Sequence, residues 1–282
     1  MYKVYYNNFW NNYDSSFHNL LFSRIFGVEV VEVGNYLEAD ILCNSVNKNN
    51  PHLLDKKPWK FTFLITYENH YGWGSPSANN LNLYSCIISS FSGLKNQIVF
   101  PYFLERIFDK GDSFSKVNAV PSKTVCAVMR NGQSRFRNKF LNLLDRATRV
   151  DYGGPYKNNM GTIVGGNHQD DSLLNFYKQY KFVIAIENSK GDHYITEKIF
   201  NALKAGVIPI YWGSQNIGLY VNPKRFIHIK NESDEEMMRV INLIQNMTDT
   251  EFNSMVSEPV LINSGDELFM GKVQEIRQLL GL

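Results

Sequence analysis

The chain has 282 residues, of which 44% are hydrophobic and 20% charged, and its 29 basic and 27 acidic residues leave a formal net charge of +2. This is the composition of an ordinary globular protein with ample core, which excludes a disordered or fibrous chain. The basic residues are scattered along the sequence, so we expect no general affinity for nucleic acid. The length predicts two domains or one large one.

Neither a membrane anchor nor a secretory leader is predicted. The opening sequence MYKVYYNNFW lacks a basic region followed by an apolar one. No segment approaches the roughly 18 apolar residues that spanning a bilayer requires. Cys43, Cys86 and Cys126 are isolated, without metal-ligand spacing, and fit buried thiols in a reducing compartment. We therefore expect a cytoplasmic protein.

Strand-like and helix-like patterns alternate over the first hundred residues. A helix is predicted at 15–27. Strands are predicted at 3–6, 28–33, 39–46, 59–66, 86–91 and 97–104. Such alternation indicates a parallel sheet with helical crossovers. The polar segment 108–122 has no periodicity and is interpreted as an interdomain linker.

The alternation then restarts. Strands are predicted at 124–129, 182–186, 207–212 and 226–229. Helices are predicted at 134–147, 170–180 and 193–206, with a helical tail from about residue 232. We therefore predict an α/β fold of two Rossmann-like domains, 1–115 and 116–282, with a ligand cleft between them at the carboxyl ends of the strands. The last helix is expected to be able to pack back on the first domain.

Several catalytic motifs are absent. The sequence has no GxGxxG, no GxxxxGK[ST], no HExxH and no GxSxG, which disfavours dinucleotide, P-loop, metalloprotease and serine-hydrolase sites. It also has no Asp-x-Asp pair that would hold a divalent metal against a nucleotide diphosphate. A metal-centred site is therefore not expected.

The segment 182–213, FVIAIENSKGDHYITEKIFNALKAGVIPIYWG, carries the strongest functional signal. A polar loop starting at Asn188 leads from a buried strand to a helix N-terminus, whose free N–H groups and dipole favour an anion. A phosphate there would lie within reach of Lys198 and the Tyr194 hydroxyl, and Glu197 could accept from sugar hydroxyls. This is the chemistry of a nucleotide-sugar site without metal. The alternative is a core helix with a solvated polar face.

The same segment closely resembles the signature of the α-1,3-fucosyltransferases, glycosyltransferase family 10. That signature is an apolar strand, Glu-Asn-Ser, an acidic loop, Tyr-x-Thr-Glu-Lys, a helix and a Pro-bearing strand. The resemblance covers most of the C-terminal half, and it implies a GT-B architecture. It also implies an inverting single displacement that moves L-fucose from GDP-fucose to a glycan hydroxyl, in α-1,3 linkage to a GlcNAc-type sugar.

The resemblance also implies a set of donor-binding residues. These are Arg137, Asn188, Ser189, Tyr194, Thr196, Glu197 and Lys198. Arg137 and Lys198 would neutralise the departing diphosphate, and Tyr194 would bond a phosphate oxygen. Asn188 and Glu197 would hold ribose or fucose hydroxyls, with the assignment left open. No cofactor or metal is required, although Mn²⁺ can stimulate the reaction.

Two upstream segments resemble the family less closely. SRFRNKFLNLLDRATRVDYGG is similar to its Arg-Asn helix and Gly-rich turn, which places the diphosphate-binding arginine at Arg137. FLITYENHYG is similar to the segment that carries Glu-Asn at a strand end, which would make Glu68 the general base. This chain has Tyr67 where the family usually has Gly, so Glu68 could instead be a surface carboxylate. Glu38, Asp40 and His70 are then the other candidates for the base.

The acceptor side is less specified. His70, Trp73 and Trp10 are candidates for stacking on an acceptor sugar, although an ordinary core or surface position is favoured for each of them. Two other functions stay open: a GT-B transferase that uses another nucleotide sugar, and an inactive protein that binds nucleotides or glycans. The acceptor, the linkage and the oligomeric state do not follow from the sequence, and a bacterial or viral source is expected.

Overall fold

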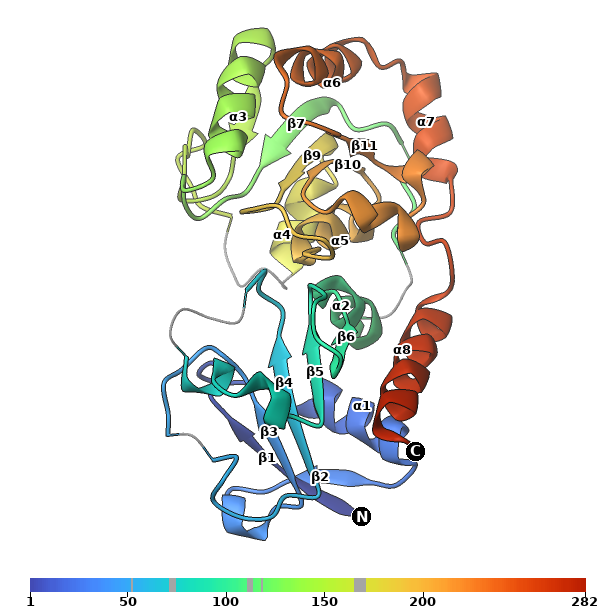
Figure 1. The fold of residues 1–282 in the computed structure, drawn as a ribbon. Helices are drawn as coiled ribbons and strands as arrows, with labels where there is room; N and C mark the ends of the chain where they lie inside the picture. The colour runs from blue at the N-terminus through green and yellow to red at the C-terminus, as the bar shows by residue number, and fades with distance from the viewer. Residues whose placement is uncertain (52, 71–74, 111–113, 118, 165–170) are drawn as a thin grey trace. The chain divides into compact units, whose positions relative to one another are not determined.

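A computed structural model describes residues 1–51, 53–70, 75–110, 114–117, 119–164 and 171–282 (Figure 1). The chain forms two compact units. Unit 1 comprises Met1–Gly111, Asp192–Tyr194 and Ser264–Leu282, and unit 2 comprises Asp112–Gly191 and Ile195–Asn263. The sequence-based boundary after residue 115 assigned Asp192–Tyr194 to the second domain, whereas the structure places this short loop in unit 1.

Unit 1 is built on a six-stranded parallel sheet with the strand order β2-β1-β3-β4-β5-β6. Its strands are β1 (Tyr2–Asn7), β2 (Val30–Glu32), β3 (Ile41–Asn44), β4 (Phe61–Thr66), β5 (Cys86–Ser89) and β6 (Gln97–Val99). Its helices are α1 (Ser16–Phe26), α2 (Tyr102–Lys110) and α8 (Gly265–Leu280), with short 3₁₀ turns at Tyr36–Glu38, Pro76–Ala78 and Leu81–Leu83. The interior strands β3 and β5 are buried along their whole length, as is typical of parallel strands covered on both faces.

The last helix belongs to unit 1. Figure 1 shows α8 beside α1, and α8 also packs on α2. The rings of Phe108 and Phe269 stack with their centroids 4.0 Å apart, and the guanidinium of Arg277 donates to the carbonyl of Ile25. The C-terminal helix therefore contributes to the core of the first unit although it lies at the far end of the sequence.

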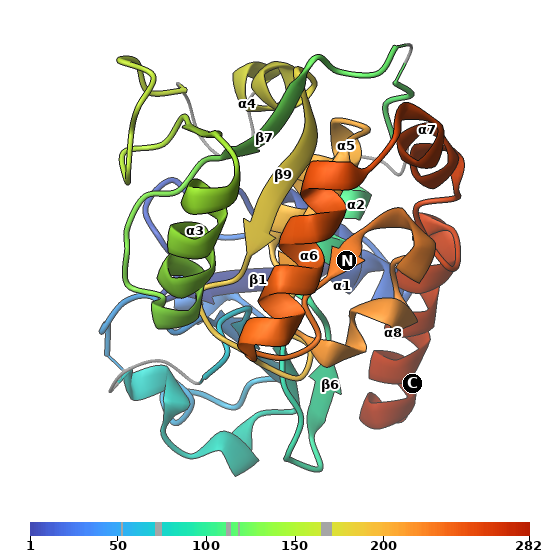
Figure 2. The ribbon, with the colours of Figure 1, turned by 90° about the horizontal axis from the view of Figure 1, so that it is seen from above.

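Unit 2 is built on a five-stranded parallel sheet with the order β11-β10-β9-β7-β8. Its strands are β7 (Lys123–Ala127), β8 (Val150–Tyr152), β9 (Tyr180–Ile186), β10 (Ile208–Trp212) and β11 (Ile227–His228). Its helices are α3 (Arg135–Ala147), α4 (Asp171–Tyr177), α5 (Glu197–Lys204), α6 (Asp234–Asn246) and α7 (Asp249–Ser257), with 3₁₀ turns at Gln215–Leu219 and Pro223–Arg225. Figure 2 shows α3 and α6 side by side over this sheet.

The strand order of unit 2 creates a natural binding position. From β7 the chain moves to β8 on one side, then crosses back to β9 on the other side and continues outward to β10 and β11. The order therefore reverses between β7 and β9. In open α/β sheets ligands bind beyond the carboxyl ends of the strands at such a switch point.

Two expected elements differ from the structure, and one strand was not expected, in each case for a local reason. The strand predicted at 97–104 ends at Val99, and α2 begins at Tyr102, because Pro101 cannot donate to a sheet and suits the start of a helix. The helix predicted from residue 193 begins only at Glu197, after Thr196 in extended conformation. Strand β8 was missed because three residues are too short to show a period.

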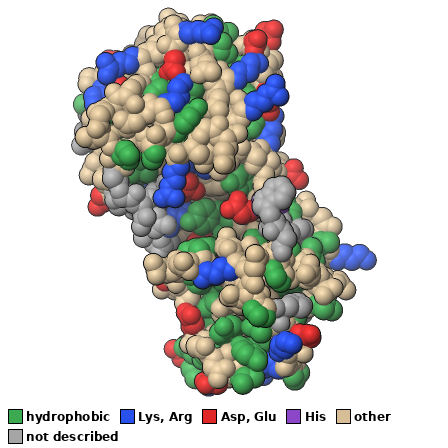
Figure 3. All heavy atoms as spheres, turned by 90° about the vertical axis from the view of Figure 1, so that its left-hand side faces the viewer, with side chains coloured by type: hydrophobic (Ala, Val, Ile, Leu, Met, Phe, Trp, Pro, Cys, Tyr) green, Lys and Arg blue, Asp and Glu red, His purple; other side chains and the backbone are tan. Residues whose placement is uncertain are grey.

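The thiols and the charges follow ordinary patterns. Cys43, Cys86 and Cys126 are free and buried, as the sequence predicted. Within the described part of the chain, no helix is both long and apolar enough to cross a membrane. On the face drawn in Figure 3, basic and acidic side chains are interspersed and form no continuous basic stripe.

Candidate active site

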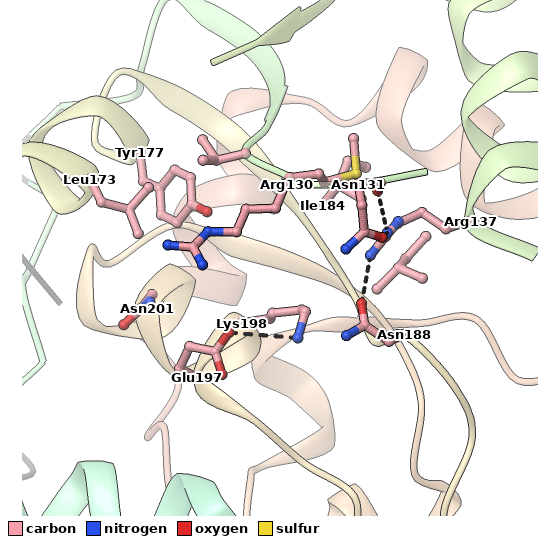
Figure 4. Close-up of a pocket in the computed structure, with 13 residues that line it drawn as sticks. Arg130, Asn131, Arg137, Leu173, Tyr177, Ile184, Asn188, Glu197, Lys198 and Asn201 are labelled. Carbon is pink, nitrogen blue, oxygen red and sulfur yellow. Dashed lines mark hydrogen bonds and ion pairs between the residues drawn. The ribbon is translucent and has the colours of Figure 1, made fainter. Parts of the chain in front are cut away.

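A pocket of about 140 Å³ lies at the switch point of unit 2. The loop after β7 contributes Arg130 and Asn131 to its lining, and the loop after β9 contributes Asn188. The helices add Arg137 from α3 and Glu197, Lys198 and Asn201 from α5 (Figure 4). The wall between them is apolar, with Leu173 and Tyr177 from α4 and Ile184 from β9. Basic and amide groups thus converge on one hollow, where an anionic ligand could be bound.

Arg137 is fixed in the wall of this pocket. Only 3% of the residue is exposed. Its Nη1 donates to Oδ1 of Asn188 over 3.1 Å, and its Nη2 donates to the carbonyl of Asn131 over 2.7 Å. Burial lowers the pKa of the guanidinium, while the nearby charge of Glu187 acts in the opposite direction. Arg137 therefore ties the loops after β7 and β9 together.

Lys198 is held by a carboxylate that the sequence analysis did not single out. Its Nζ donates to Oε2 of Glu187 over 2.8 Å and lies 3.6 Å from Oε1 of Glu197. Glu187 is fully buried and also accepts from the backbone N–H and the hydroxyl of Thr196. A Cβ on Gly213 would lie 2.7 Å from Cγ of Glu187, so this glycine leaves the space that the carboxylate side chain occupies.

The electrostatics of Glu187 reflect two opposing effects. Burial raises its pKa, and the positive charge of Lys198 lowers it. An unpaired carboxylate in this position would be costly, so the pair depends on both charges being present.

The remaining predicted donor residues do not line the pocket. The hydroxyl of Thr196 donates to Glu187 over 2.8 Å to the nearer oxygen. Ser189 is half-buried and follows Asn188, and Tyr194 is buried in the short loop that belongs to unit 1. Their contacts with a donor stay predictions.

Sequence reasoning missed four residues of this site. Arg130, Asn131 and Asn201 line the pocket, and Glu187 lies beneath Lys198. Arg130 and Asn131 directly follow the predicted strand 124–129. Their place at the carboxyl end of a parallel strand was the signal that could have identified them.

Glu68 lies at the carboxyl end of β4 in unit 1, as the sequence predicted, and is exposed. Its carboxylate makes no hydrogen bond or ion pair with any described residue. The preceding Tyr67 is anchored: its hydroxyl lies 3.1 Å from Nε2 of the fully buried His18 and also donates to Glu105. This anchoring fixes the end of the strand from which Glu68 projects.

Two alternative bases occupy the opposite edge of that sheet. Glu38 and Asp40 both precede β3, at the amino ends of the strands. Asp40 is also committed to Lys60 over 2.8 Å and to the backbone N–H of Lys3 over 3.0 Å. Of the three alternative candidates for the general base, only His70 lies with Glu68 at the carboxyl ends of the strands.

The acceptor candidates are less defined. Trp10 is 42% exposed and packs edge-on against Tyr13, with ring centroids 5.1 Å apart. His70 is half-buried, and its carbonyl accepts from the hydroxyl of Thr66 over 3.3 Å. Trp73 lies outside the described residues.

Potential metal ligands are not clustered in the described ranges, where no group of three or more His, Cys, Asp or Glu side chains could hold an ion. Metal independence itself is a matter of chemistry and stays a prediction.

Comparison with known proteins supports the resemblance seen in the sequence. The chain is 29% identical over 224 residues to the putative fucosyltransferase R654 of Acanthamoeba polyphaga mimivirus, a match that covers 75% of this chain and 36% of that protein. It is 29% identical over 143 residues to the α-(1,3)-fucosyltransferase FucT of Helicobacter pylori, covering 50% of this chain and 29% of FucT. The chain thus spans well under half the length of both relatives.

A crystal structure of an α1,3-fucosyltransferase with GDP-fucose has the same fold. The TM-score is 0.67 at 20% identity, and the match covers 98% of this chain and 90% of that one. The predicted α/β fold of the GT-B type is therefore confirmed. Residues 119–255, which contain the whole pocket, match the family described as glycosyltransferase family 10 (fucosyltransferase) C-term. The likeness to glycosyltransferase family 10 is therefore carried by the C-terminal part of the chain.

Proposed function

We propose that this chain is an inverting fucosyltransferase, which transfers L-fucose from GDP-fucose to a hydroxyl of a glycan. One observation carries the proposal: a pocket lined by basic and amide side chains occupies the switch point of a family 10 domain. The similar α1,3-fucosyltransferase was crystallised with GDP-fucose, and the name of the Helicobacter pylori relative supports an α-1,3 linkage. A GlcNAc-type sugar is the proposed acceptor.

In this proposal the donor binds in unit 2. Arg137 and Lys198 face the diphosphate, because cationic donors suit phosphate oxygens. Asn188 and Glu197 bind hydroxyls of the ribose or of fucose. Thr196 contributes by holding Glu187, which in turn fixes Lys198. Ser189 and Tyr194 remain proposed donor contacts.

The reaction is a single displacement. The acceptor oxygen attacks the anomeric carbon of GDP-β-L-fucose and forms the new C–O bond. The bond from that carbon to the β-phosphate oxygen breaks, and GDP leaves with the electron pair. Glu68 takes the proton of the acceptor hydroxyl, a general-base role worth roughly 10²–10⁴ in rate. The product is an α-fucoside, since attack comes from the face opposite to GDP.

Charge on the leaving group is balanced by side chains in this proposal. The cations of the pocket stabilise the developing negative charge electrostatically. No resident metal is needed, and Mn²⁺ in solution can raise the rate by helping GDP to depart. Trp10 and His70 are proposed acceptor contacts, and a cytoplasmic location is proposed for the enzyme.

An acceptor array tests this function. The purified chain is incubated with GDP-fucose on a panel of immobilised glycans, with GDP-mannose and UDP-glucose as parallel donors. We expect fucose on glycans that carry GlcNAc and no transfer from the other donors. Transfer from another nucleotide sugar alone would show a different GT-B transferase. Tight binding of GDP without release of fucose from GDP-fucose would show a binding protein.

A further inference from the structure

The three basic side chains of the pocket differ in what they already bind. Arg137 donates to Asn188 and to the backbone of Asn131. Lys198 is paired with the buried Glu187 over 2.8 Å. Arg130 is exposed and makes no hydrogen bond or ion pair with any of the described residues. Figure 4 shows its side chain extending into the pocket.

The balance of charges around the pocket also points to Arg130 as a cation that can bind an anionic ligand. Among the described residues, the cluster has three cations, Arg130, Arg137 and Lys198, and two carboxylates, Glu187 and Glu197, so its formal charge is +1. Lys198 lies within 4 Å of both carboxylates, so its charge is compensated inside the protein. Without Arg130, the cluster would be formally neutral and would offer little attraction to a dianion.

We propose that Arg130 is a further diphosphate-binding cation of this site, beside Arg137 and Lys198. The inference rests on the proposed function and deepens it by naming another group that recognises the pyrophosphate of a nucleoside diphosphate. A guanidinium matches two phosphate oxygens in a bidentate geometry. Arg130 can form this pair without giving up an existing bond, whereas Lys198 would have to share its ammonium with Glu187.

The position of Arg130 in the fold supports this role. It follows β7, whose carboxyl end lies next to that of β9 at the switch point. The backbone beside it is closely packed: a Cβ on Gly154 would lie 2.4 Å from the backbone N of Met129, and the carbonyl of Met129 accepts from the N–H of Tyr156 over 3.0 Å. The side chain of Arg130 thus projects from a closely packed backbone toward the pocket.

Calorimetry on Arg130→Gln tests the proposal with three ligands. GDP, GMP and guanosine share one base and differ only in phosphate. We expect GDP to bind about 10-fold to 100-fold more weakly to the variant, the range for a charged hydrogen bond. GMP should lose less, and guanosine should be unaffected. Arg130→Lys should recover part of the lost GDP affinity, since an ammonium keeps the positive charge but not the bidentate geometry of the guanidinium.

Arg135→Gln is the matched control. It removes the same charge five positions along the chain, from an exposed side chain that does not line the pocket. We expect its GDP affinity to stay within about twofold of the wild type, because exposed charges away from a ligand are screened. If Arg135→Gln lost as much GDP affinity as Arg130→Gln, the effect would come from the net charge of the protein, and the proposal would be overturned.

The outcomes separate this inference from the proposed function. If the wild type binds GDP and Arg130→Gln binds it equally well, the role of Arg130 is refuted, while the proposed fucosyltransferase function is not. An equal loss for guanosine would mean that Arg130 contacts the base, which also overturns the role proposed for Arg130. If the wild type binds UDP but not GDP, the proposed use of GDP-fucose is refuted. If the affinity for UDP also depends on Arg130, the role of Arg130 in binding a diphosphate is supported. A wild type that binds neither GDP, UDP nor inorganic pyrophosphate overturns both.

Discussion

The ammonium of Lys198 lies 2.8 Å from the carboxylate of Glu187, a side chain with no exposed surface. The two residues are eleven positions apart, one just after β9 and the other in the first turn of α5. Thr196 completes the arrangement, since its backbone N–H and its hydroxyl both donate to the same carboxylate. The position of Lys198 is therefore set by the protein before any ligand binds.

This pair predicts a pH-dependent loss of stability in Lys198→Met. We expect the free energy of unfolding to fall by roughly 3 kcal/mol near neutral pH, because the variant buries a carboxylate without its cation. Burial already raises the pKa of Glu187 above its ordinary value of 4.5, and removing Lys198 raises that pKa further. The native state then holds a proton that the unfolded state releases. Stability is thus fully present below the ordinary pKa and declines as the pH rises through the raised pKa.

Urea unfolding at about pH 5 and about pH 8 measures this effect. The matched control is the double variant Glu187→Gln with Lys198→Met, which removes both charges and should restore most of the stability and flatten its pH dependence. If Lys198→Met is as stable as the wild type at both pH values, the ion pair between Lys198 and the buried Glu187 does not stabilise the protein, which contradicts this prediction.

Arg137→Ala should weaken GDP binding by about 1.5–3 kcal/mol, since a charged hydrogen bond to the diphosphate is lost. The variant also leaves Asn188 and the carbonyl of Asn131 without their donor, so the loop after β9 loses a fixed neighbour. Calorimetry with GDP, together with urea unfolding in the same buffer, separates a binding loss from a folding loss. Unchanged GDP affinity in a folded variant would remove Arg137 from the donor site.

Metal removal is expected to leave most of the activity. In the proposed mechanism the developing charge on GDP is met by side chains, so EDTA should not abolish transfer. Added Mn²⁺ is expected to raise the rate without binding to the protein alone, which equilibrium dialysis checks. Complete loss of transfer in EDTA that metal restores would be incompatible with this proposal.

The local part of the site was predictable, and its long-range contacts were not. The run FVIAI predicted a buried strand, and the polar residues after it predicted a site at its carboxyl end, where Asn188, Glu197 and Lys198 meet. The bond from Arg137 to Asn188 joins residues 51 positions apart and depends on β7 pairing with β9. Such a pairing is set by the packing of the whole sheet and leaves no local pattern.

The start of α5 shows the same limit. Periodicity alone favoured a helix from residue 193, yet the helix begins at Glu197. Thr196 directs its backbone N–H and hydroxyl to Glu187, which keeps the preceding residues out of the helix. A hydrogen bond to a buried side chain of another element overrode the local preference.

Glu68→Gln tests the proposed base. The variant should keep its fold and its GDP affinity, because Glu68 belongs to unit 1 and the donor pocket to unit 2. Transfer should fall by about 10²-fold or more, since an amide cannot take the proton of the acceptor. Turnover and GDP affinity are measured on the same preparation.

Glu29→Gln provides the comparison. Glu29 is an exposed carboxylate of the same unit that precedes β2, at the amino ends of the strands. Its loss should leave turnover unchanged. Near-wild-type turnover in Glu68→Gln with intact GDP binding would exclude Glu68, and His70 would then be the next residue to test at that edge of the sheet.

Proton NMR of the reaction itself tests the central claim most directly. The wild-type chain is mixed with GDP-fucose and a soluble GlcNAc-containing glycan, and the anomeric signals are followed over time, with GDP-mannose and UDP-glucose in parallel samples. The account predicts that GDP-fucose alone is consumed, that GDP appears in equal amount, and that the first product is an α-fucoside. Consumption of a different nucleotide sugar in place of GDP-fucose, or a β-fucoside as the first product, would contradict it.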